Sequence, residues 1–96
     1  MAFIWYSKYT MEFEFDPSKS AANQRKHGID FDTAQALWED GDRLQVPART
    51  QGETRFMLIG KIAGQHWSAI FTPRAGKIRM ISVRRSRMEE VEAYEN

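Results

Sequence analysis

The chain has 96 residues, a net charge of +1 and no cysteine. A chain of this length forms one domain, so we treat residues 1–96 as a single unit. Without cysteine, neither a disulfide framework nor a thiolate metal site can supplement the hydrophobic core. No apolar run approaches the ~20 residues that a membrane helix needs, and the first residues lack the pattern of an export signal. We therefore expect a soluble, cytoplasmic protein with no membrane partner.

The charges are distributed unevenly along the chain. Residues 1–53 carry nine acids and six bases, residues 54–88 carry eight bases and no acid, and residues 89–96 carry four acids and no base. A stretch without carboxylates that ends on Arg84-Arg85-Ser86-Arg87 attracts a polyanion such as nucleic acid. The alternative is a solvated basic face that the acidic segments neutralise.

The first half of the chain predicts one strand and two helices. Polar and apolar residues alternate over 12–15, as they do in a half-buried strand. Asp16 then provides an N-cap, and the helix that it begins is expected to run over Pro17–His27. A second helix is expected over Thr33–Asp40, with Asp32 as its N-cap.

From residue 44 the pattern changes to period two and to short apolar runs. Strands are therefore expected over residues 44–46, 55–62, 66–72 and 77–83. Turn chemistry at Ala63-Gly64 and over residues 73–76 favours an antiparallel meander of the last three strands. A short acidic helix is expected over residues 88–96. The predicted class is α+β, with two N-terminal helices packed on a twisted antiparallel sheet and a short C-terminal helix.

Three segments taken together resemble the BrnT family of toxins. In chain order they are Phe13–Asp16 with Asn23–Phe31, Glu53–Phe56 with Ile59-Gly60, and Arg79–Arg85 with Glu90 and Tyr94. The resemblance implies a fold similar to RelE-type toxins and a ribonuclease activity that inhibits translation and growth. It also implies a partner of the BrnA type, an antitoxin with a ribbon-helix-helix DNA-binding module, in a complex of two toxins and two antitoxins.

Residues 1–10 lie outside the pattern of the family, which begins at Met11. They are either an artefact of the translation start or an added edge segment that covers apolar surface. We expect this segment to be dispensable.

RNA carries its own nucleophile, the 2′-hydroxyl group. Its cleavage requires in-line positioning, a proton acceptor, a proton donor and stabilisation of charge on the phosphate. The basic stretch contains no carboxylate and the whole chain has two histidines, so the sequence offers no evident ligand set for a metal. We therefore expect a metal-independent endoribonuclease that uses no cofactor.

Arginine suits the phosphate because its planar guanidinium group binds two oxygens at once and stays charged. We predict Arg55, Arg79 and Arg85 as catalytic arginines. Period two places Arg79 and Arg85 on one face of the last strand and Arg84 on the other. For each arginine the alternative is a solvated surface charge, and Glu53 is expected to pair with Arg55.

His27 is the predicted general acid or base, since histidine is the residue type that can gain or lose a proton near neutral pH. The alternative is a structural helix end, where a cation is favoured by the helix dipole. Further RNA contacts are expected from Lys26, Lys61, Lys77, Arg84 and Arg87. Three aromatic residues are expected to pack in the core rather than to stack on bases, namely Phe56, Trp67 and Phe71.

Two other functions use the same distribution of charge. A binding module would hold RNA or DNA on the basic sheet without cutting it, and an interaction protein would use this face for an acidic partner. Cleavage of RNA by the purified chain distinguishes the enzyme from both.

Overall fold

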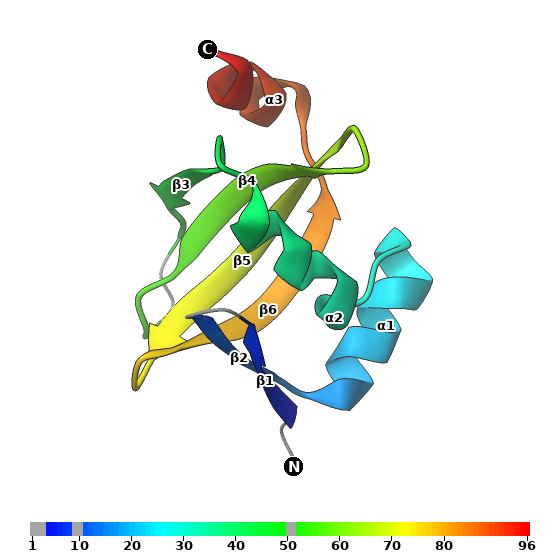
Figure 1. The fold of residues 1–96 in the computed structure, drawn as a ribbon, viewed down its shortest axis with the longest axis vertical. Helices are drawn as coiled ribbons and strands as arrows, with labels where there is room; N and C mark the ends of the chain where they lie inside the picture. The colour runs from blue at the N-terminus through cyan, green and yellow to red at the C-terminus, as the bar shows by residue number, and fades with distance from the viewer. Residues whose placement is uncertain (1–3, 9–10, 50–51) are drawn as a thin grey trace.

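The computed structural model describes residues 4–8, 11–49 and 52–96. Its elements, in chain order, are β1 (Ile4–Lys8), β2 (Met11–Phe15), α1 (Pro17–His27), α2 (Phe31–Ala34), the 3-10 helix η1 (Gln35–Glu39), β3 (Leu44–Pro47), β4 (Phe56–Ile62), β5 (Gln65–Arg74), β6 (Lys77–Arg85) and α3 (Met88–Glu95). The strands form one sheet in the order β1-β2-β6-β5-β4-β3 (Figure 1). In the part of the chain described, no helix is long and apolar enough to cross a membrane.

The α+β class is confirmed, but the sheet is mixed rather than antiparallel. Strand β2 pairs with β6 in parallel, whereas the other neighbouring strands are antiparallel. In the parallel pair Glu14 lies opposite Arg79, 65 residues further along the chain. Turn residues predict hairpins between consecutive strands. They carry no information about the pairing of two strands that lie so far apart in the sequence. The prediction of an antiparallel sheet is therefore wrong at this pair.

Both two-residue turns of the meander have the backbone that tight hairpins require. Ala63-Gly64 and Ala75-Gly76 have positive φ at both residues, between 51° and 82°, as type I′ turns demand. The second turn is shorter than predicted, because Pro73 and Arg74 extend β5. These turns fix β4, β5 and β6 in antiparallel register.

Helix α1 lies along the edge of β6 rather than on a face of the sheet (Figure 1). The Asn23 side chain donates to the carbonyl oxygens of Ile29 (2.8 Å) and Val83 (2.9 Å) and accepts from the Val83 N–H (3.1 Å). These bonds satisfy the backbone edge of β6 beyond its pairing with β2. Of the two predicted N-terminal helices, only the second covers the sheet.

That second helical segment begins earlier than predicted. Its N-cap is Asp30, whose carboxylate accepts from the Thr33 N–H at 2.7 Å, so the assignment of Asp32 as the cap is wrong. Both aspartates suit an N-cap, and the burial of Phe31 inside the first turn accompanies the earlier start. From Gln35 the helix continues as the 3-10 helix η1.

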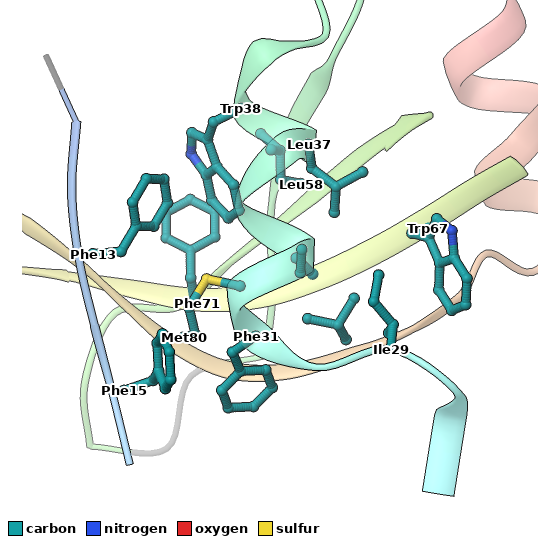
Figure 2. Packing of buried hydrophobic residues seen from close by; sticks show 13 residues of the cluster. Phe13, Phe15, Ile29, Phe31, Leu37, Trp38, Leu58, Trp67, Phe71 and Met80 are labelled. Carbon is teal, nitrogen blue, oxygen red and sulfur yellow. The ribbon is translucent and has the colours of Figure 1, made fainter. Parts of the chain in front are cut away.

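The core lies between α2–η1 and one face of the sheet (Figure 2). Trp38 of η1 meets Phe13 and Phe71 edge-on, at centroid distances of 5.1 and 5.2 Å. η1 approaches β4 closely, since a Cβ on Gly60 would lie 3.1 Å from the Leu37 side chain. The expected core packing of the three aromatics is confirmed: Trp67 and Phe71 are buried, and Phe56 packs against the cluster.

A β-bulge in β6 sets which residues face the core. Ile70 pairs with Ser82 and Phe71 pairs with Met80, so Ile81 is an extra residue. Met80 and Val83 are consequently both buried under the helices. We call this face of the sheet the helix face. The opposite, open face carries Glu14, Met57, Ile70, Thr72, Arg79, Ser82 and Arg84.

Of the predicted extension, the structure describes residues 4–8 as β1, and the rest lies outside the described residues. β1 pairs with β2 from Ile4 opposite Phe15 to Lys8 opposite Met11. Strand β2 thus has a neighbour on each side. That the segment is dispensable stays a prediction.

Candidate nucleic-acid interface

Two of the predicted arginines lie in one row across the open face. Arg79 pairs with Thr72, and the ladder from Phe56 opposite Phe71 places Arg55 on the other side of Thr72. The Ala48 N–H donates to the Arg55 carbonyl oxygen at 3.0 Å, which continues the β3–β4 ladder through this position. The two arginine backbones are two strand spacings apart, or roughly 10 Å. Their long side chains can therefore reach one group above Thr72.

Each arginine of the row is held by a neighbouring carboxylate. Arg79 donates from Nε to Glu14 at 3.0 Å, and Arg55 pairs through Nη2 with Glu53 at 3.4 Å. The second contact confirms the expected pairing with Glu53. Both arginine side chains remain about one quarter exposed, at 23% and 27%. A phosphate on this row would share or replace these carboxylate partners, which keep the guanidinium groups oriented before it binds.

The next row of the open face is apolar in its middle. It contains Val46, Met57, Ile70 and Ser82, which follow one another across β3, β4, β5 and β6. All four side chains are half-buried. A base or ribose placed beside the arginine row would therefore meet apolar surface rather than charge.

Helix α3 is anchored to the far end of the open face by a buried carboxylate. Glu90 accepts from Arg84 at both oxygens (2.8 and 2.7 Å), from the Ser68 hydroxyl (2.8 Å) and from the Arg87 N–H (2.9 Å). Burial alone would raise the pKa of Glu90. The hydrogen bonds, with that from Arg84 foremost, outweigh burial and lower this pKa from 4.5 to about 2. Arg84 is thus engaged in holding α3 in place.

Arg85 does not lie on the same face as Arg79. Its guanidinium group lies on the helix face, 5.4 Å from the Trp67 ring centroid. The prediction from period two is wrong because the bulge at Ile81 inverts the alternation between the two positions. Arg79 and Arg84 share the open face instead.

The predicted lysines and Arg87 lie around the periphery. Lys77 follows the β5–β6 turn and is half-buried, whereas Lys61 is exposed and pairs with Glu95 at 3.6 Å near α3. Arg87 is the exposed N-cap residue of α3. None of the three is placed in the Arg55–Arg79 row.

His27 and Lys26 belong to a separate groove between α1 and the edge of β6. The groove is lined by Lys19, Ala22, Asn23, Lys26, His27, Ile81 and Ser82. His27 is half-buried there and Lys26 is exposed. The structure therefore brings Arg55 and Arg79 together, and places His27 outside their row, in the groove that Ser82 also lines.

Sequence reasoning missed Thr72 and Lys19. Thr72 is the centre of the arginine row, and its buried hydroxyl donates to the Thr54 carbonyl oxygen at 2.6 Å. The two-residue turn between β4 and β5 sets the register of these strands. Aligning them at that turn could have placed Thr72 opposite Arg55. Lys19 lies far from the basic stretch in sequence, and no local signal places it beside β6.

The described residues contain no group of three or more His, Cys, Asp or Glu side chains positioned to hold a metal ion. The side chains that form the candidate site are arginines, hydroxyl-bearing residues and carboxylates.

An α+β domain whose sheet carries arginines on the open face is a small basic domain suited to a polyanionic ligand. A family model described as the BrnT ribonuclease toxin of type II toxin-antitoxin systems matches residues 15–90. The chain therefore belongs to the BrnT family of ribonuclease toxins. This membership implies a protein antitoxin as its partner. None of the curated proteins matches the chain significantly.

Proposed function

We propose that this chain is an endoribonuclease that cleaves RNA in the cytoplasm by attack of a 2′-hydroxyl group on the adjacent phosphate, without a metal ion. The observation that carries the proposal is the row in which Arg55 and Arg79 flank Thr72 on the open face. The family match supplies the substrate class. We further propose that the fold is of the RelE type.

In this mechanism the arginines stabilise charge and a separate group moves protons. The 2′-oxygen forms a bond to phosphorus while the bond from phosphorus to the 5′-oxygen breaks, which leaves a 2′,3′-cyclic phosphate and a 5′-hydroxyl. Arg55 and Arg79 would neutralise the extra charge on the phosphoryl oxygens. His27 is the proposed proton carrier, taking the 2′-hydroxyl proton or supplying one to the 5′-oxygen.

The remaining cations are proposed to hold the RNA backbone around this centre. Lys26 is exposed and lines the groove, and Lys77 is half-buried at the start of β6, two residues before Arg79. Lys61, Arg84 and Arg87 already contact or flank α3, so we propose that they act at the margin of the surface. Arg85 is proposed to contact the RNA backbone from the helix face.

We propose that the antitoxin is a BrnA-like ribbon-helix-helix protein that covers the open face in a complex of two toxins and two antitoxins. An acidic or polar segment of the antitoxin would compete with RNA for Arg55 and Arg79. Binding of antitoxin with unchanged RNA affinity would contradict this competition.

Single-turnover cleavage of RNA in excess EDTA tests the proposal. Wild type is expected to leave 2′,3′-cyclic phosphate ends, and Arg79→Ala is expected to lose ~100–1000-fold in rate at saturating RNA. Arg43→Ala is the matched control, because Arg43 is exposed and its guanidinium group donates to the Asp40 carbonyl oxygen at 3.1 Å, outside the Arg55–Arg79 row. A strict requirement for a divalent ion would overturn the mechanism, and binding without cleavage would favour the non-catalytic module.

A further inference from the structure

A second surface with basic side chains lies outside the arginine row, in the groove between α1 and β6. Its basic side chains occupy one stripe of α1, since residues 19, 22, 23, 26 and 27 recur at spacings of three and four. The helix contains no acidic residue, although the first half of the chain is acidic overall. Lys19 and Lys26, both exposed, therefore face the groove without a carboxylate from their own helix.

The groove is a preformed part of the fold. Its floor includes Asn23, which is buried and makes the three hydrogen bonds that tie α1 to Val83 and Ile29. Its volume is about 210 Å³, below the ~300–1,000 Å³ of pockets that enclose whole small molecules. A hollow of this size suits one phosphate or one base of a chain that continues beyond it.

Through Ser82 the groove adjoins the row of the open face that lies next to the arginine row. Ser82 lines the groove and lies on the open face, where it pairs with Ile70. Arg79 pairs with Thr72, two residues from Ile70 along β5. The two positions are therefore roughly 7 Å apart along the sheet, a distance comparable to one nucleotide step of an extended strand. An RNA strand on the row can leave the sheet over the edge of β6 directly into the groove.

We propose that this groove is a phosphate subsite for a nucleotide that flanks the cleaved bond, with Lys19 and Lys26 as its ligands. The proposal rests on the proposed function, because it requires an RNA strand on the Arg55–Arg79 row. Lys19 and Lys26 act here as binding residues that seat the strand, and they take no part in the bond changes. The enzyme should therefore prefer RNA longer than a dinucleotide.

The test measures binding of a cleavage-resistant 2′-O-methyl RNA of ~9 nucleotides to the full chain at several salt concentrations. The double variant Lys19→Ala/Lys26→Ala should bind roughly 10-fold more weakly. The slope of log K against log salt should fall by ~0.7 for each phosphate contact that is lost.

Arg25→Ala is the matched control, because Arg25 lies on the same turn of α1 but lines a different groove with Phe15 and Pro17. The proposal is overturned if the double variant keeps the wild-type affinity and slope, or if Arg25→Ala loses as much as the double variant. The readout is independent of catalysis. If the wild type binds RNA but cleaves none, the proposed function fails while the slope still decides whether the groove is a subsite.

Discussion

Replacing Glu90 by glutamine should destabilise the fold in a way that depends on pH. A carboxyl pKa lowered from 4.5 to about 2 corresponds to about 3 kcal/mol of stabilisation of the folded state. Glutamine keeps the shape of the side chain but loses the charge that pairs with Arg84. At neutral pH we therefore expect Glu90→Gln to cost ~3 kcal/mol, equivalent to a fall in Tm of at least ~12 °C in a domain this small.

The sign of the pH dependence follows from the direction of the shift. Because folding lowers the pKa of Glu90, its stabilising contribution is complete above pH 4.5 and is lost as pH falls through about 2. The difference in unfolding free energy between wild type and Glu90→Gln should therefore shrink from ~3 kcal/mol toward zero over this range. Urea unfolding at pH ~7, ~4 and ~2.5 measures it.

Glu92→Gln on the same helix is the control, because Glu92 is exposed and should change stability by less than ~0.5 kcal/mol. The reasoning is refuted if Glu90→Gln costs less than ~1 kcal/mol at neutral pH. It is also refuted if the cost is the same at pH ~7 and ~2.5, since the loss would then come from packing rather than from the charge.

Four further experiments test the site and the fold. Arg85→Ala should cleave RNA within a few-fold of wild type at saturating RNA while Arg79→Ala loses ~100–1000-fold, and equal losses would show that strand face does not decide function. His27→Ala should remove one limb of the pH–rate profile, whereas an unchanged profile makes His27 a helix end. Asn23→Ala should cost ~2–4 kcal/mol in urea unfolding, because both backbone groups of a buried strand position lose their partner, and a loss below ~1 kcal/mol would contradict this. Removal of residues 1–10 should lower Tm by less than ~8 °C, and a larger fall would show that β1 is needed for stability.

The sequence determined the local elements and the class of protein. Asp16 before Pro17, the short turns at Gly64 and Gly76, and period-two alternation each depend on the backbone preferences of a few neighbouring residues. Those preferences are local, so α1 and the meander strands could be predicted close to their observed bounds. The three segments that resemble the BrnT family likewise could be found along the chain, and the family model confirms that the chain belongs to this family.

The tertiary structure alone decided which charged side chains from distant parts of the sequence lie together. One extra residue at Ile81 moved Arg85 to the helix face and left Arg79 on the open face, because a bulge inverts the alternation of every residue beyond it. The parallel pairing of β2 with β6 brought Glu14 to Arg79. Lys19 lies beside the edge of β6 because Asn23, on the same helix, forms hydrogen bonds with the backbone of Val83. The pairing of Glu14 with Arg79 and that of Asn23 with Val83 span 60 residues or more, and the bulge depends on the register between β5 and β6. Local preferences specify neither.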